Sequence, residues 1–210
     1  AVTFTNKAAL EMKNRVAGLL ASEGMRRNLP EGLFLGTFHA LGVSILREHG
    51  SHMRIPRNFS ILDEEDTRQI IRDLLKEFEL DPEVFSVPRI RASISRLKNE
   101  LVDASSFAKN DDRDSYQQKL QALYAAYEAR LQKMKGLDFD DLLLKTVMLL
   151  ETFPDVKNFY ADRWHYIHID EYQDTNRVQY ALSRMLAAGH RNIAVVGDID
   201  QAIYSWRGAD

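Results

Sequence analysis

Two adjacent carboxylates, Asp170 and Glu171, follow an apolar run of residues that ends at Ile169. Neighbouring carboxylates repel each other and cost stability unless a cation or a reacting water requires them. The first acid could hold Mg²⁺, directly or through water, and the second could orient or deprotonate a water that attacks a phosphate. Such a pair would suit metal-assisted phosphate hydrolysis, with Asp170 on the metal and Glu171 on the water.

A purely structural explanation of this pair is also open. Asp170 could cap the helix that follows, while Glu171 and Asp174 could favour the first turn of that helix through its dipole. For an isolated Asp-Glu pair this explanation would be favoured. The full run of residues 169–176, placed a short helix before residues 195–201, favours the chemical explanation.

A second group of side chains suited to chemistry lies further along the chain. Gln201 follows a predicted strand, where its uncharged amide could contact a γ-phosphate and sense it, although it cannot act as a base. Tyr204, Trp206 and Arg207 could stack on nucleic-acid bases and touch a phosphate, with stacking worth about 1–3 kcal/mol per base. The alternative is that the two aromatic side chains pack within a strand. The neighbouring arginine and glycine favour a surface that receives a ligand.

The elements that must position these groups alternate between strand and helix, which predicts an α/β fold with a parallel sheet. In such sheets ligands bind beyond the carboxyl ends of the strands, which is where the acidic residues are placed. The predicted strands are residues 1–5, 33–37, 166–169 and 192–196, and helices begin at Asn6 and Phe38.

From residue 56 the sequence pattern becomes rich in helix, and no convincing strand follows until Tyr166. We predict an inserted helical subdomain at residues 56–134. Within it, an apolar helical stripe is flanked by basic residues. A solvated amphipathic helix, whose basic side chains reach out to water, is favoured over a nucleic-acid contact. The stripe consists of Ile90, Ile94, Leu97 and Leu101, and the flanking basic residues are Arg89, Arg91, Arg96 and Lys98.

The composition of the 210 residues limits the class of protein. A hydrophobic content of 45% suffices for a buried core, and a net charge of -3 argues against a protein that coats nucleic acid by bulk charge. The absence of cysteine excludes disulfides and thiolate metal sites, and the histidines show no zinc-binding spacing. No apolar run reaches the roughly 18 residues of a membrane span, so we expect a cytoplasmic protein with no membrane partner.

Five segments occur in a distinctive order: TFTNKAA at 3–9, GTFHA at 36–40, DFDDL at 138–142, DEYQD at 170–174 and GDIDQAIYSWRGA at 197–209. In that order they resemble motif Ia, motif Ib, the segment that re-enters the first motor domain, motif II (Walker B) and motif III of superfamily 1 DNA helicases of the UvrD/Rep/PcrA type. Any one segment alone would be a far weaker signal than the ordered set.

This resemblance implies a RecA-like P-loop NTPase domain 1A, formed by residues 1–55 and 135–210, with a helical domain 1B inserted at 56–134. It implies ATP and Mg²⁺ as cofactors, with Asp170 on the metal, Glu171 on the water and Gln201 on the γ-phosphate. It also implies 3′ to 5′ movement on single-stranded DNA, binding of junctions between single and double strands, and a second RecA-like motor domain as partner. The residues that would contact single-stranded DNA are Phe4, Thr5, Asn6, Thr37, His39, Tyr204, Trp206 and Arg207.

The sequence departs from the family pattern in two respects. None of its ten glycines precedes a lysine, so it lacks the phosphate-binding loop GxxxxGK followed by Ser or Thr. Motifs IV to VI and the second motor domain are also missing. We therefore expect a fragment of an ATP-dependent DNA helicase that is inactive alone. A nucleic-acid-binding module without catalysis and the motor part of a helicase-nuclease subunit are the alternatives.

Overall fold

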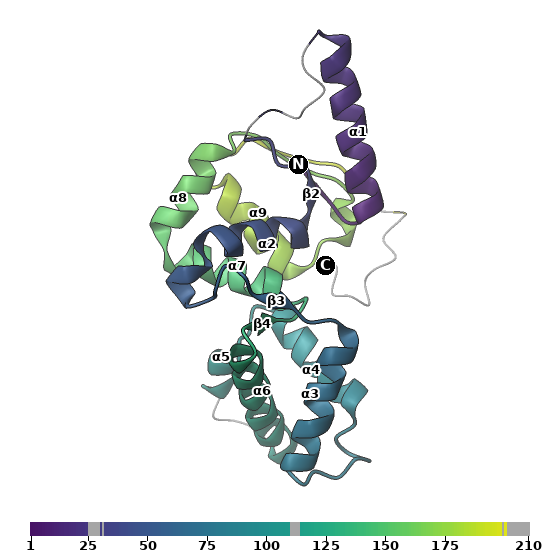
Figure 1. The fold of residues 1–210 in the computed structure, drawn as a ribbon, viewed down its shortest axis with the longest axis vertical. Helices are drawn as coiled ribbons and strands as arrows, with labels where there is room; N and C mark the ends of the chain where they lie inside the picture. Colours follow the sequence, from purple (N-terminus) through teal and green to yellow (C-terminus); the bar gives the residue numbers. More distant parts are fainter. Residues whose placement is uncertain (25–29, 31, 110–113, 199, 201–210) are drawn as a thin grey trace.

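A computed structural model describes residues 1–24, 30, 32–109, 114–198 and 200. It shows an α/β fold built on a parallel sheet (Figure 1). The predicted site residues Gln201, Tyr204, Trp206 and Arg207 lie outside the described residues. Within the described part of the chain, no helix is both long and apolar enough to cross a membrane.

The main sheet has four parallel strands in the order β2-β1-β5-β6, which confirms the predicted parallel arrangement. Each strand is shorter than the predicted segment. Pairing of Thr3 with Thr37 aligns the ends of β1 and β2, and pairing of Ile169 with Val195 aligns the ends of β5 and β6. The strands are β1 (Val2–Thr3), β2 (Gly36–Thr37), β5 (Ile167–Ile169) and β6 (Ile193–Val195).

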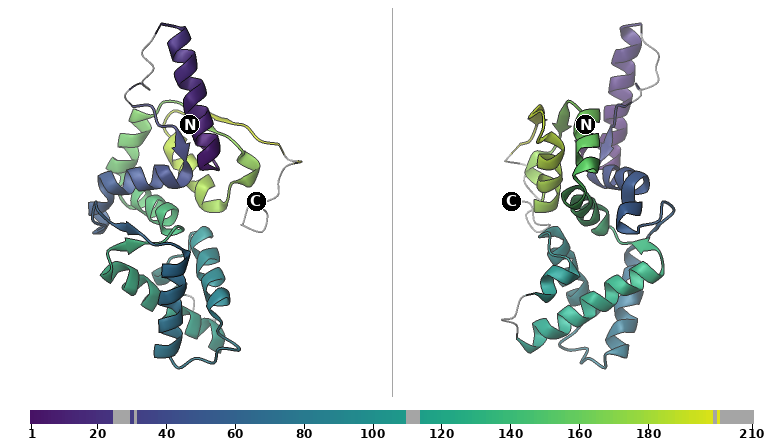
Figure 2. Two further views of the ribbon diagram at one scale, coloured as in Figure 1. Left: turned by 45° about the vertical axis from the view of Figure 1, so that its right-hand side comes forward. Right: turned by 90° about the vertical axis from the view of Figure 1, so that its left-hand side faces the viewer.

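Several of the described α-helices accompany this sheet, and two of them begin where the sequence predicts, at Asn6 and Phe38. Helix α1 extends away from the rest of the molecule in every view of Figures 1 and 2. Of its residues only Ala9 is buried, and Leu19 remains 67% exposed. The helices are α1 (Asn6–Ser22), α2 (Phe38–His49), α7 (Asp141–Thr152), α8 (Pro154–Arg163) and α9 (Arg177–Ala187).

The helical segment lies below the sheet layer in Figure 1. Two short strands within residues 60–137 pair in parallel, so the expectation of no strand between residue 56 and Tyr166 was wrong. They lie in runs of only four and two residues between charged or amide side chains, too short to show an alternating pattern. The elements are β3 (Ser60–Ile61), α3 (Glu64–Glu77), α4 (Val87–Asn99), α5 (Ala104–Ala108), α6 (Ser115–Lys133) and β4 (Gly136–Leu137), and 3-10 turns are formed by η1 (Gly50–Met53) and η2 (Tyr172–Asp174).

Buried apolar side chains form two groups. One joins the sheet to α2, α7 and α9 and includes Ile45, Leu149 and Leu182. The other lies among α3, α4 and α6 and spans residues 62–131. The predicted apolar stripe of α4 faces this second group through Ile90, Ile94 and Leu97, whereas Leu101 lies beyond the helix and packs against the first group. The segment between α4 and α5 therefore reaches back to the sheet layer.

Lys98 corrects the prediction made for the basic residues of α4. It does not reach out to water but is 1% exposed. Its Nζ lies 2.7 Å from Glu128 of α6, 2.8 Å from Asp138 and 2.8 Å from Asp141 of α7. The helical period of α4 cannot reveal these partners because they come from distant parts of the sequence. The remaining basic side chains of the set stay near the surface: Arg89 lies over Tyr116, Arg91 pairs with Glu64, and Arg96 pairs with Glu100.

The buried cluster around Lys98 contains one more carboxylate than ammonium group. Lys98 and Lys145 supply two positive charges against the three carboxylates, and Lys145 lies 2.7 Å from Glu128. Burial raises the pKa of Asp141 to about 7, with Asp138 and Glu128 acting in the same direction and Lys98 and Lys145 opposing them. One proton on Asp141 makes the cluster neutral, which lowers the cost of burying it.

Asp141 should make the stability of the protein depend on pH. Its pKa is higher in the folded protein than the roughly 3.9 of an unfolded chain, so its contribution is complete below about pH 4 and is lost as pH rises through about 7. We expect Asp141→Asn to remove a slope of up to about 1.4 kcal/mol per pH unit from the free energy of unfolding between about pH 5 and 7. Urea denaturation across this range measures the slope. The exposed Asp162→Asn is the matched control, and an unchanged slope in Asp141→Asn would contradict the assignment.

Candidate functional site

Asp170 lies directly after β5, at the carboxyl edge of the sheet. Its backbone N–H donates to the carbonyl of Val2 at 3.0 Å, and the hydroxyl of Thr3 donates to its Oδ2 at 3.4 Å. Thr3 is fully buried in β1, so the neighbouring strand fixes how this carboxylate leaves the sheet. The Asp170 side chain remains partly exposed and offers oxygen ligands of the kind that Mg²⁺ binds through one or two carboxylates and water.

Glu171 stands in the left-handed region of the backbone, with φ of 55° and ψ of 44°. A non-glycine residue rarely adopts this conformation, and it persists only where surrounding contacts enforce it. The enforcing contacts come from Val196, the residue after β6, because the N–H of Tyr172 donates to the carbonyl of Val196 at 2.9 Å and the N–H of Val196 donates to the carbonyl of Ile169 at 2.8 Å. The backbone that carries Glu171 is therefore held on both sides.

Gln173 connects the Glu171 carboxylate to the segment after β6. Its Nε2 donates to Oε2 of Glu171 at 2.7 Å, and its Oε1 accepts the N–H of Asp198 at 3.0 Å. A Cβ placed on Gly197 would lie 2.6 Å from this Oε1, so a larger residue there would displace the Gln173 amide from its present position. Gln173 was not predicted to have a role of its own. The available signal was an uncharged amide two residues after a candidate catalytic carboxylate.

The helix that follows this turn is capped by Asn176 and not by Asp170, the cap considered from the sequence. Helix α9 begins at Arg177, and the Asn176 side chain accepts the N–H of Gln179 at 3.0 Å. The Gln179 side chain accepts the N–H of Asn176 in return, which completes a capping box. Asp170 lies before η2 and does not cap α9, so the helix-capping explanation of that residue was wrong.

The predicted DNA-contacting residues of the first two strand–helix units lie at the same edge. Thr5 and Thr37 cap α1 and α2, with their hydroxyls accepting the N–H groups of Ala8 at 3.1 Å and Ala40 at 3.2 Å. Neither helix has an acidic residue in its first turn, so the partial positive charge of each N-terminus is not compensated. Thr37 is only 6% exposed, while Thr5 and Asn6 are exposed and Phe4 is partly exposed. Thr37 therefore acts on the helix start more than on the surface.

Phe139, which was not predicted to contact DNA, also lies at this surface, beside His39. The His39 ring stacks on Phe139, with ring centroids 3.7 Å apart and an interplanar angle of 21°. Phe139 is 57% exposed, so much of its ring faces solvent. It belongs to the motif-like residues 138–142, but no contact was predicted for it. A phenylalanine between two aspartates was the available signal.

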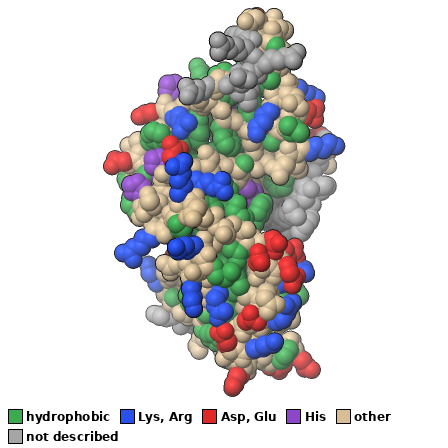
Figure 3. Space-filling view, in the orientation of Figure 1, with side chains coloured by type: hydrophobic (Ala, Val, Ile, Leu, Met, Phe, Trp, Pro, Cys, Tyr) green, Lys and Arg blue, Asp and Glu red, His purple; other side chains and the backbone are tan. Residues whose placement is uncertain are grey.

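The charge on the face shown in Figure 3 is mixed. Acidic side chains gather over the start of α3, where Glu64, Glu65 and Asp66 occupy the first turn. Lys and Arg side chains gather on the opposite flank of the same view. No single broad basic face covers the part of the molecule described in this view, which agrees with a nucleic-acid site made of local contacts.

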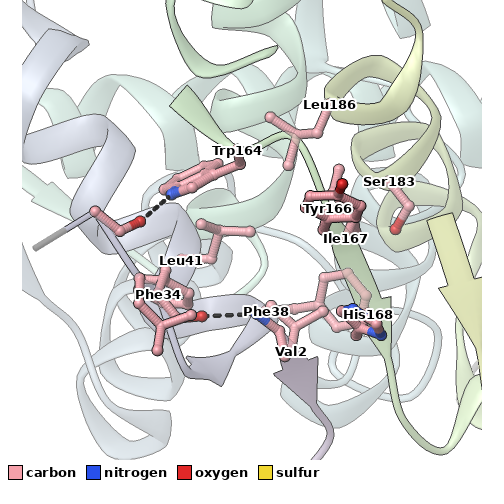
Figure 4. A pocket seen from close by; sticks show the side chains of 13 residues that line it. Val2, Phe34, Phe38, Leu41, Trp164, Tyr166, Ile167, His168, Ser183 and Leu186 are labelled. Atoms are coloured by element: carbon pink, nitrogen blue, oxygen red, sulfur yellow. Dashed lines mark hydrogen bonds between the residues drawn. The ribbon is translucent and has the colours of Figure 1, made fainter. Parts of the chain in front are cut away.

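An apolar cavity of about 60 Å³ lies at the other end of the sheet (Figure 4). It is lined by Val2 and Ile167, the first residues of β1 and β5, and by Phe34 and Trp164, whose Nε1 donates to the carbonyl of Gly32 at 3.0 Å. Its lining is largely apolar and it opens at the amino ends of the strands, away from Asp170. The carboxyl edge therefore remains the candidate site.

Comparison with known proteins identifies relatives of this chain. Residues 1–210 match the UvrD/REP helicase N-terminal domain family. The chain is 46% identical over 210 residues to the ATP-dependent DNA helicase PcrA of Bacillus subtilis, and 42% identical to PcrA of Staphylococcus aureus and of Staphylococcus epidermidis. In each case the alignment covers 100% of this chain and 28% of the relative. The chain belongs to the UvrD/REP helicase N-terminal domain family.

Proposed function

We propose that this chain is part of an ATP-dependent DNA helicase that moves 3′ to 5′ along single-stranded DNA and separates duplexes. In this proposal residues 1–55 and 135–210 form a RecA-like domain 1A, and residues 56–134 form a helical domain 1B. The observation that carries it is the Asp170-Glu171 pair at the carboxyl end of β5, with Glu171 held by Gln173. The family match over the whole chain and the PcrA relatives support it.

The chemistry we assign to this edge is hydrolysis of the γ-phosphate of ATP. Asp170 would hold Mg²⁺, which neutralises phosphate charge when bound. Glu171 would orient the attacking water and accept its proton, and Gln173 keeps the Glu171 carboxylate in one orientation through its 2.7 Å hydrogen bond. Gln201 would contact the γ-phosphate. Because the chain has no GxxxxGK loop, we propose that residues 1–210 alone neither hydrolyse ATP nor unwind DNA.

The path that we assign to single-stranded DNA runs over the starts of α1 and α2. Two uncompensated helix N-termini favour phosphate oxygens there. The His39–Phe139 stack adds an exposed aromatic face on which a base could stack, and Phe4, Thr5 and Asn6 lie beside the start of α1. Together with Tyr204, Trp206 and Arg207, these residues form the proposed DNA path.

Glu171→Gln tests the catalytic assignment in the complete helicase of which we propose this chain is part. We expect DNA-stimulated ATP turnover to fall at least about 100-fold, because a general base is lost, while nucleotide binding persists. Steady-state ATPase and fluorescent-nucleotide binding measure the two effects. The control is Glu151→Gln on the exposed surface of α7. Wild-type turnover in Glu171→Gln would refute the assignment, and absence of ATPase in the unmutated helicase would favour the binding module without catalysis.

Gln173→Ala tests whether the bridge orients Glu171. We expect kcat for ATP to fall about 10-fold with little change in KM, because the carboxylate loses a positioning hydrogen bond that acts on the water rather than on nucleotide binding. The exposed Gln69→Ala on α3 serves as the control. A kcat equal to that of the unmutated helicase would show that Glu171 is held without Gln173.

Phe139→Ala tests the aromatic surface. We expect the free energy of binding to single-stranded DNA to weaken by about 1–3 kcal/mol, while Phe139→Trp keeps binding near the original value because stacking tolerates any aromatic ring. Fluorescence anisotropy with a labelled oligonucleotide measures both. Phe159→Ala, at another exposed position on α8, is the matched control. Equal affinities for Phe139→Ala and the unmutated protein would remove Phe139 from the DNA path.

A further inference from the structure

Two asparagines connect the helical layer to the turn that carries the candidate catalytic carboxylate. The Nδ2 of Asn176 donates to Oδ1 of Asn99 at 2.6 Å. Asn99 is the last residue of α4, and Asn176 is the N-cap of α9. Helices α4 and α9 are also in contact. This bond spans residues far apart in sequence and joins elements that belong to different buried groups.

Each amide is fixed in orientation by its other partners. On the Asn176 side, Oδ1 is engaged by the N–H of Gln179, which leaves Nδ2 as the donor towards Asn99. On the Asn99 side, Nδ2 donates to the carbonyl of Ser95 at 2.9 Å and to Oδ1 of Asp140 at 3.1 Å, which leaves Oδ1 as the acceptor. The donor and acceptor atoms of the pair are therefore determined by the network around them.

The end of α4 is a firm support for this bond. The residue before Asn99 is Lys98, whose ammonium is buried among three carboxylates at 2.7 to 2.8 Å. Breaking such a cluster by moving one member would leave buried charges uncompensated. Asn99 therefore cannot shift far without disturbing the most strongly held part of α4.

The segment between Asp170 and Asn176 is thus held at both ends. At one end, Asp170 is bonded to β1 through Val2 and Thr3. At the other end, Asn176 is bonded to α4 through Asn99. Between these points lie the left-handed Glu171 and the turn η2, whose Gln173 contacts the Glu171 carboxylate. The position of Asn176 sets where η2 must end, and so it affects how Gln173 meets Glu171.

We propose that Asn99 is a positioning residue for Glu171, acting through Asn176. The helical layer then sets the geometry of the ATPase turn by a single hydrogen bond from the end of α4. A displacement of α4 relative to α9 would be transmitted to Glu171 without any contact between α4 and the nucleotide. This inference rests on the proposed function and adds to it a residue outside all five sequence motifs.

Two substitutions in the complete helicase remove the bond from its two sides. Asn99→Leu removes the acceptor, and Asn176→Ser keeps a capping oxygen for α9 but loses the donor to Asn99. We expect each to lower kcat for ATP about 10-fold with KM unchanged. Ser95→Ala, which leaves the bond to Asn176 in place, is the matched control.

The double variant Asn99→Leu with Asn176→Ser gives the sharpest result. If the two residues act through one bond, kcat falls about 10-fold in the double variant rather than about 100-fold. Hydrogen exchange at the amides of residues 172–175 should increase in Asn99→Leu and not in Ser95→Ala. Equal kcat in Asn99→Leu and the unmutated helicase would overturn the inference, as would additive effects in the double variant. An inactive unmutated helicase, or an active Glu171→Gln, would instead count against the proposed function.

Discussion

The burial of Lys98 is the interaction on which the arrangement of the two layers depends. An ammonium removed from water is costly unless carboxylates surround it at short range, and here three of them do so at 2.7 to 2.8 Å. They come from α6, from Asp138 after β4 and from α7, so the cluster can form only when α4 and α6 meet the start of α7. The hydroxyl of Tyr127 also donates at 2.8 Å to Oδ2 of Asp138, the same oxygen that Lys98 contacts. This polar junction around Lys98 thus has one geometry in which its charges compensate one another, whereas apolar side chains can pack in many geometries.

Much of the sheet layer was predictable because its signals are local. Strand–helix alternation predicted the parallel sheet, and Thr5 and Thr37 cap their helices at most two residues after the strands end. The strands β1 and β2 also have two residues each but lie within longer predicted segments, whereas β3 and β4 were missed because they lie in runs of only four and two residues between charged or amide side chains. Lys98 was misassigned because its partners lie at residues 128–141, and a helical period describes only the face of its own helix.

The carboxylate pair carried a local signal that the prediction did not use. Whether Asp170 is a cap depends on where the next helix starts, and Asn176 followed by Gln179 is a capping pattern visible in the sequence itself. That pattern alone places the start of α9 after Asn176 and leaves Asp170 free for chemistry. Gln173 and Phe139 are different, because their contacts with Glu171 and His39 depend on a turn conformation and on strand order that no local pattern encodes.

The polar contacts that connect Lys98 to Glu171 differ in strength, and this difference bears on function. At the junction, charged groups are buried and hold α4 firmly. One residue further on, neutral amides link Asn99 to Asn176, and a neutral hydrogen bond contributes only about 0.5–1.5 kcal/mol. Beyond it, Glu171 stands in a backbone conformation that only its surroundings maintain. The end of α4 is thus held firmly, the amide bond from Asn99 to Asn176 is weaker, and the backbone of Glu171 is strained. In this arrangement a small movement of the helical layer changes the geometry of the Glu171 carboxylate before it disrupts the core.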